Sequence, residues 1–184
     1  MHEILIALAK AGILVTLNQP ENFDLTKALQ DYPELKQDAA TFVTLTIGPD
    51  DQLRGCIGSL EAHRALYKDI ISNAQAAALR DPRFTPLTLE ELQNIKIEVS
   101  ILTKPKVLTY TDVNDLKNKL VPLQDGVILK HKGRHATYLP QVWEQLPTFG
   151  PFMKSLCQKA GLSSNCLTEH PEISIYQVKE YKEK

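Results

Sequence analysis

The residues best able to take part in chemistry lie in one short segment, Leu53 to Leu60, which reads LRGCIGSL. In an extended strand successive side chains alternate between faces, so Arg54, Cys56 and Gly58 are predicted to share one face. A cation beside a free thiol favours the nucleophilic thiolate, and glycines in a strand permit close approach of a ligand or another backbone. The alternative is a tightly packed strand in which the thiol of Cys56 is buried and inert.

A second candidate group lies in the segment Ile95 to Leu102, IKIEVSIL, where apolar and polar residues alternate. This alternation predicts a strand with one buried face, and Glu98 falls on its polar face. If this strand shares a sheet with LRGCIGSL, Glu98 is a candidate acid–base or orienting group near Cys56. An ordinary surface ion pair is the simpler explanation of Glu98.

Arg83 follows a predicted helix in the run Asp81-Pro82-Arg83-Phe84. An arginine at such a position is a candidate binder of a carboxylate or a phosphate. The same run also reads as a helix stop that contains an anchoring aromatic ring and an ion pair, because proline disfavours helix at the residue before it.

Several classes of site are absent from the sequence. The five histidines form no HExxH pattern, no Walker A loop or GxGxxG run occurs, and no metal or cofactor is predicted. GCIG matches the GXXG loop of a KH domain superficially, but that loop joins helices and here the flanks read as strand. His63 lies seven residues from Cys56, and this spacing leaves a Cys–His pair undecided.

Charge and cysteine content narrow the functional class further. The chain has 21 Lys plus Arg and 22 Asp plus Glu, a net charge of −1, which disfavours non-specific nucleic-acid binding. The three cysteines are odd in number and lack CxxC spacing, so a disulfide framework is not expected, and reduced thiols in a cytoplasmic protein fit best. No apolar stretch has the length of a membrane span.

The elements that must position these residues are mixed in type. A chain of 184 residues suits one domain, with room for a small lobe. Apolar spacing, turn residues and proline positions predict helices near residues 3–17, 25–30, 64–79, 113–119 and 152–160, and strands near 41–47, 53–60, 95–102, 127–130, 134–139 and 172–181. Two hairpins within an irregular element order predict an α+β fold with a largely antiparallel sheet flanked by helices.

Several segments together resemble one family. The matching runs are FVTLTIGPDDQLRGCIGSLEAHRAL, DIISNAQAAALRDPRFTPLTLEEL, IKIEVSILTKP, DGVILKHKGRHATYLPQVWEQLP and KAGL. They occur in order between Phe42 and Leu162, and LRGCIG is the most specific of them. The chain is identified from these runs as a member of the AMMECR family, whose prokaryotic members are called AmmeMemoRadiSam system protein A.

The resemblance implies a single AMMECR-type domain over residues 1–184, with two subdomains of which the smaller is formed by a discontinuous part of the chain. It also implies a cleft lined by Arg54, Cys56 and Gly58, with Arg134 as a further binding candidate. The family association points to partners such as Memo-like or radical SAM proteins. The resemblance supplies no reaction, and because the residues complete no catalytic constellation, we favour a ligand- or partner-binding module with its cleft around LRGCIGSL. The alternatives are a Cys-dependent enzyme acting on a small molecule or protein in a pathway with those partners, and a regulatory factor in nucleic-acid or translation processes.

Overall fold

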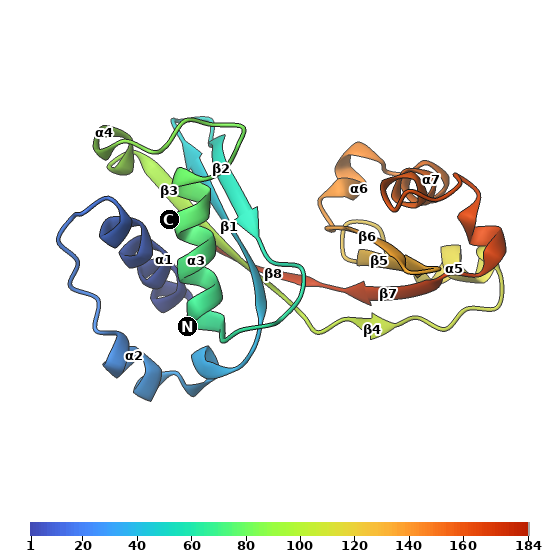
Figure 1. Ribbon diagram of the computed structural model, residues 1–184, viewed down its shortest axis with the longest axis horizontal. Helices are drawn as coiled ribbons and strands as arrows, with labels where there is room; N and C mark the ends of the chain where they lie inside the picture. Colours follow the sequence, from blue (N-terminus) through green and yellow to red (C-terminus); the bar gives the residue numbers. More distant parts are fainter. Residues whose placement is uncertain (184) are drawn as a thin grey trace. The chain divides into compact units, whose positions relative to one another are not determined.

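The chain divides into two compact units in the structure, a computed structural model that describes residues 1–183 (Figure 1). The first unit contains residues 1–102 and the segment from Lys179, and the second contains residues 103–178. The helices are α1 His2–Thr16, α2 Leu25–Asp31, α3 Leu66–Leu79, α4 Leu89–Leu92, α5 Val113–Lys119, α6 Val142–Gln145 and α7 Phe149–Lys159, with short 3₁₀ turns η1 Pro33–Lys36 and η2 Cys166–Glu169. The strands are β1 Ala40–Ile47, β2 Gln52–Gly58, β3 Ile95–Leu102, β4 Lys106–Val107, β5 Gly126–His131, β6 Arg134–Tyr138, β7 Glu172–Tyr176 and β8 Val178–Lys182.

The sheet of the first unit has the strand order β2-β1-β3-β8, so β2 forms one edge. β1 pairs antiparallel with both β2 and β3, which places Thr44 opposite Cys56 on one side and opposite Glu98 on the other. The predicted hairpin between β1 and β2 is therefore confirmed. The antiparallel register also brings the two polar candidates, Cys56 and Glu98, onto one face.

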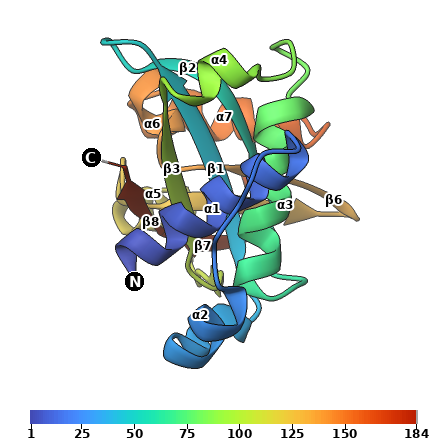
Figure 2. The same cartoon turned by 90° about the vertical axis from the view of Figure 1, so that its left-hand side faces the viewer.

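Helices α1 and α3 cover one face of this sheet, as Figure 2 shows with both helices in front of the strands. The alternate residues of β1 and β3 that point toward the helices are almost completely buried: Val43, Leu45, Ile97 and Val99. α3 meets them with small side chains, among them Ala74 and Ala77, which allow the helix to approach closely. The hydrophobic core of this unit therefore fixes which face of the sheet carries the polar residues.

The second unit has its own sheet, with the order β4-β7-β5-β6, and its own core. The rings of Trp143 and Phe152 stack with centroids 3.6 Å apart, and the indole N–H of Trp143 donates to the carbonyl of Asp125 at 2.9 Å. The α+β prediction, with a smaller second part, agrees with this architecture. Among residues 1–183, no helix combines the length and the apolar character needed to cross a membrane.

Two predictions about chain organisation require correction. The discontinuous unit is the larger one, and the smaller unit is a continuous segment. The single strand predicted near residues 172–181 is interrupted at Gln177, so that β7 joins the second sheet and β8 joins the first. Alternation continues across the break, which explains why the pattern reads as one strand.

The prediction of three reduced thiols is wrong for two of them. Cys157 of α7 and Cys166 of η2 form a disulfide, and both residues are buried. α7 ends at a left-handed Gly161 with φ of +71°, and the chain turns back toward the helix there. Sequence spacing alone gives no sign of this reversal, because the two cysteines are nine positions apart without a CxxC pattern.

Candidate functional site

The face of the first sheet directed away from α1 and α3 carries a row of polar side chains across four strands: Cys56, Thr44, Glu98 and Lys182. We call it the polar row. The hydroxyl of Thr44 donates to Cys56 Sγ at 3.4 Å, and Lys182 Nζ lies 3.1 Å from Glu98 Oε2. Cys56 is a free, half-buried cysteine. The row therefore presents a thiol, a hydroxyl and an ion pair next to one another.

Glu98 and Cys56 share this face but are not neighbours. Thr44 lies between them on β1, and two strand spacings correspond to about 10 Å. The carboxylate of Glu98 instead accepts from the Ser100 hydroxyl at 3.2 Å and pairs with Lys182. In this geometry Glu98 contributes an ion pair to the surface and does not contact the thiol.

Arg54 has a different position from the one that regular alternation predicts. The pairing of β1 with β2 shifts register between Leu45 and Thr46, so a bulge occurs at Arg54. Its guanidinium is buried and donates to both carboxylate oxygens of Glu91, at 2.7 and 2.9 Å. The hydrogen bonds from Arg54 lower the pKa of Glu91 to about 2. Arg54 therefore holds α4 against β2, and its charge is already paired.

The two glycines of the segment are required by packing. A Cβ on Gly55 would lie 2.2 Å from the carbonyl oxygen of Ala77, in the backbone of α3. A Cβ on Gly58 would lie 2.2 Å from the ring of Phe42, which is the residue opposite it on β1. The ring of Phe42 fills the space that Gly58 leaves open, so the predicted ligand-lining role of Gly58 is replaced here by an internal contact.

Asp81 and Arg83 hold the outer edge of β2 at Cys56. The buried Asp81 accepts from the backbone N–H of Cys56 at 2.8 Å, and Arg83 donates to the Cys56 carbonyl at 3.3 Å. The two side chains also pair with each other at 2.7 Å. Hydrogen bonds from Arg83 hold the pKa of Asp81 well below its usual range. Together they replace the missing neighbouring strand at this edge.

Arg83 is thus a predicted binding residue that contacts Cys56, through its backbone carbonyl. Its side chain remains 53% exposed although two of its nitrogens are engaged by Asp81. The hydrogen bonds to Asp81 are the main cause that raises the pKa of Arg83. Arg83 lies over the Phe84 ring at 5.4 Å, and Arg54 approaches the same ring at 5.8 Å.

A buried network on α3 was not foreseen. The carboxylate of Asp69, which is fully buried, accepts hydrogen bonds from the backbone and hydroxyl of Thr41, from Ser59, from Arg64 and from Asn73. It ties the start of α3 to the beginning of β1 and the end of β2. The sequence does contain one signal of this network: two polar residues, at positions 69 and 73, fall on the apolar face of a predicted helix.

The remaining candidates do not join the polar row. Arg134 belongs to the second unit and donates to the carbonyl of Gly161, where it caps the end of α7. The ring of His63 contacts the carbonyl of Glu61 at 2.8 Å. Within residues 1–183, no histidine contacts Cys56, and no group of three or more metal-binding side chains occurs.

Comparison with known proteins places these features in a family. The sequence model of the AMMECR1 family matches residues 6–181, which includes β2, the Asp81–Arg83 pair and the whole second unit. The chain belongs to the AMMECR1 family. The resemblance seen in LRGCIG and the accompanying runs is thereby confirmed.

The relatives are AMMECR1-family proteins of archaea. The chain is 34% identical to protein MK0488 of Methanopyrus kandleri over 95% of its own length and 83% of that protein. It is 36% identical to protein TV1384 of Thermoplasma volcanium, over 88% of the chain and 78% of the relative. The crystal structure of the uncharacterized protein PH0010 from Pyrococcus horikoshii aligns with a TM-score of 0.79 at 31% identity, covering 99% of this chain and 91% of PH0010. The AMMECR1 fold therefore extends across both units.

Proposed function

We propose that this AMMECR1-family chain is a binding module that uses the polar row, with Arg83 beside Cys56, to recognise a partner protein. The observation that carries the proposal is the surroundings of the thiol. The polar neighbour of Cys56 Sγ is the hydroxyl of Thr44, and the carboxylate of Glu98 is engaged by Ser100 and Lys182. A nucleophilic cysteine needs a base or an unengaged cation that stabilises the thiolate.

The composition of the row supports a polar partner surface. Thiol, hydroxyl, carboxylate and ammonium groups follow one another on rigid strands, so their relative positions are fixed before binding. Arg83 adds an exposed cation whose Nη1 is not engaged by Asp81 or Cys56 and can donate to an acceptor on the partner. The family resemblance, rather than this geometry, is the basis on which we propose that the chain belongs to the AmmeMemoRadiSam system, with a Memo-like or radical SAM protein as its partner in the cytoplasm.

Titration calorimetry with the Memo-like and radical SAM proteins of the same organism tests the proposal. Glu98→Lys breaks the pair with Lys182 and places a second ammonium group in the row, so its charge pattern no longer complements the partner and binding is expected to weaken at least about tenfold. Cys56→Ser is expected to bind within about threefold of the native chain, since the hydroxyl preserves a polar contact of similar size.

Glu90→Lys is the matched control, because Glu90 is an exposed carboxylate of α4 outside the row. Thermal melting of each variant establishes that it is folded. Absence of binding by the native chain, or equal binding by Glu98→Lys and Glu90→Lys, would overturn the proposed function.

A Cys-dependent enzyme is the second candidate, because Cys56 is a free cysteine and is only half-buried. It requires a reactive thiol. Alkylation of the native protein followed by mass spectrometry tests this directly, since Cys157 and Cys166 are bonded to each other. A Cys56 that stays unlabelled while the unfolded chain is labelled would exclude a nucleophilic role.

A further inference from the structure

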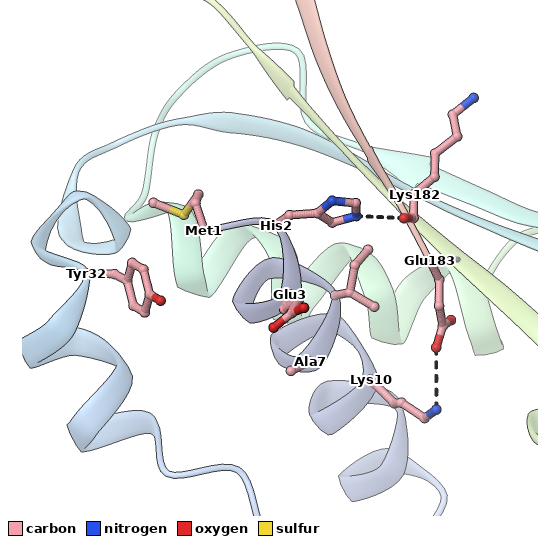
Figure 3. Close-up of a pocket in the computed structure, with 9 residues that line it drawn as sticks. Met1, His2, Glu3, Ala7, Lys10, Tyr32, Lys182 and Glu183 are labelled. Carbon is pink, nitrogen blue, oxygen red and sulfur yellow. Dashed lines mark hydrogen bonds and ion pairs between the residues drawn. The ribbon is translucent and has the colours of Figure 1, made fainter.

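The first unit contains a cavity of about 610 Å³ between the start of α1 and the end of β8 (Figure 3). The groups on its wall are engaged with one another. His2 Nε2 lies 2.6 Å from the carbonyl of Lys182. Lys10 lies 3.6 Å from Glu183, whose carboxylate also accepts from the backbone N–H of Ile97 at 3.1 Å. These contacts fasten β8 to α1, and since charges of both signs line the cavity, it selects no class of ligand.

A feature of the second unit is directed at solvent instead. The turn between α5 and β5 contains residues 121–124, and all four are exposed. Leu123 is 61% exposed and Val121 is 44% exposed, with Pro122 between them. Single exposed apolar residues are common on protein surfaces, whereas three in succession form a local apolar patch. We call residues 121–123 the apolar turn.

The backbone of Leu123 is strained. Its φ is +65°, in the left-handed region, where the Cβ of a leucine crowds the following carbonyl. Glycine or asparagine adopts this conformation at lower cost. The exposed side chain of Leu123 gains little from the core of the second unit to offset that cost. Strained residues of this kind concentrate at sites of recognition, where the position of the side chain matters more than its stability.

The apolar turn is held rigidly at both ends. Before it, Leu120 is buried, and after it Asp125 is buried. The carboxylate of Asp125 accepts from the backbone N–H of Val121 at 2.9 Å, and its own N–H donates to the Val121 carbonyl at 3.0 Å. The carbonyl of Asp125 in turn accepts from the buried indole of Trp143. Leu123 is therefore presented in a fixed conformation, which lowers the entropy lost on binding.

The size and charge of this patch indicate what covers it. Three side chains bury far less than the roughly 1,000 Å² of a stable dimer. Pairing of two copies about a two-fold axis would also bring Lys117 of both copies onto one interface, and no described residue neutralises Lys117. A bilayer surface requires a larger apolar anchor or a polybasic patch, and the last turn of α5 supplies two lysines, of which Lys119 is paired with Asp115. A small, rigid tip fits a preformed pocket in another protein.

We propose that the apolar turn is a docking site for a protein that presents an apolar pocket with a carboxylate at its rim. Leu123 enters the pocket, Val121 and Pro122 pack on its edge, and Lys117 pairs with the carboxylate. This site belongs to the second unit and is independent of the partner proposed for the polar row, so either proposal can fail without the other.

Photo-crosslinking identifies the partner. The photoreactive amino acid p-benzoylphenylalanine is placed at position 123 of the full chain, and at position 89 as the matched control, because Leu89 is an exposed leucine of α4 in the first unit. Both proteins are irradiated in an extract of the source organism, and mass spectrometry identifies the products. A protein crosslinked from position 123 but not from position 89 is expected. That protein is then purified for calorimetry.

Leu123→Asn supplies the decisive comparison, because its two expected effects have opposite signs. Relief of backbone strain should raise the melting temperature by about 2–4 °C. Loss of the aliphatic side chain should weaken binding of the identified protein at least about tenfold. Leu89→Asn should leave that affinity within about threefold of the native value, and Leu123→Met, which keeps an apolar side chain, should do the same.

Four outcomes would overturn the proposal. The first is the same set of crosslinked products from positions 123 and 89, and the second is equal affinity of Leu123→Asn and the native chain. The third is a lower melting temperature of Leu123→Asn, which would show that Leu123 packs within the fold. The fourth is another occupant: crosslinks only to a second copy of the chain, or co-sedimentation with phosphatidylserine–phosphatidylcholine vesicles that Leu123→Asn abolishes.

Discussion

The two units hold their cysteines in opposite environments. In the first, Cys56 lies on a half-buried polar face beside the hydroxyl of Thr44, and its peptide group is fixed by Asp81 and Arg83. In the second, Cys157 and Cys166 are buried in an apolar core and bonded to each other. The fold of the backbone around a cysteine, rather than its sequence neighbours, therefore decides whether its sulfur stays free or forms a disulfide.

The units also gain their stability differently. Around Cys56 the strand is held by a close backbone approach at Gly55 and by the buried Arg54–Glu91 pair, which leave the sulfur without a structural bond. In the second unit, stacking of Trp143 on Phe152 holds α6 against α7, and the disulfide fastens α7 to η2. Substitutions in the first unit should therefore change stability through backbone packing and charge. Substitutions in the second unit should change it through the disulfide.

The largest effect is expected from Gly55→Ala. Its new Cβ would meet the backbone oxygen of Ala77 at 2.2 Å, so α3 must move away from the sheet, at a cost of about 4 kcal/mol in unfolding free energy. Gly150→Ala is the control, because a Cβ there meets nothing within 4 Å. Urea denaturation measures both. A Gly55→Ala loss no greater than that of Gly150→Ala would contradict the close packing of α3 on β2.

Arg54→Ala should follow, because it leaves the carboxylate of Glu91 without its cation and removes a side chain that is 9% exposed. Breaking a pair of this kind costs about 3 kcal/mol. The comparison is Lys96→Ala, which breaks the exposed pair with Asp51 and should cost under about 1 kcal/mol. Equal losses in the two variants, measured by urea denaturation, would remove the distinction between a structural arginine and a surface charge.

Removal of the disulfide by Cys157→Ser with Cys166→Ser should lower the stability of the second unit by about 2–3 kcal/mol, as expected for a loop of this length. Hydrogen exchange followed by mass spectrometry measures each unit separately. Faster exchange is expected in α7 and η2, while β1 to β3 keep their rates. Faster exchange in the first unit as well would show that the two units do not unfold independently.

Acid should weaken the first unit through Glu91. Its pKa falls from 4.5 to about 2 in the folded chain, so the stabilisation is complete above pH 4.5 and is lost as the pH falls toward about 2. Allowing for partial exposure, the loss is about 2 kcal/mol. Denaturation curves across this pH range measure it, and in Arg54→Ala the dependence should be smaller. If the unfolding free energy of Arg54→Ala falls with pH as steeply as that of the native chain, carboxylates other than Glu91 cause the loss of stability.

The smallest effect is expected from Cys56→Ser, which keeps a small polar side chain beside Thr44 and should change stability by less than about 1 kcal/mol. Thermal melting checks this. A loss as large as that of Arg54→Ala would mean that the sulfur of Cys56 is a packing element, and the contrast between the two cysteine regions would fail.

Much of the architecture was predictable from local patterns. Alternation in IKIEVSIL predicts β3 with the bounds that the structure has, Ile95–Leu102. At α4, Thr88 and Glu91 form a capping box, and the S/T-x-x-E spacing of such a box is a local sequence pattern too. The pattern of the last strand failed at Gln177, since alternation cannot reveal that a strand passes from one sheet to another. The site was predicted in part: Cys56 and Glu98 share a face, but Thr44 between them was not anticipated.

What the sequence determined by itself was the AMMECR family and the α+β class, because family motifs and short-range periodicity can be read directly from the order of residues. Only the tertiary structure decided that Arg54 pairs with Glu91, that Arg83 reaches Cys56 and that Cys157 bonds with Cys166. The strand bulge at Arg54 and the chain reversal at Gly161 bring two of these pairs together. The two residues of each pair lie between 9 and 37 positions apart in the sequence. Contacts across such separations produce no periodic pattern in the sequence, so local patterns cannot predict them.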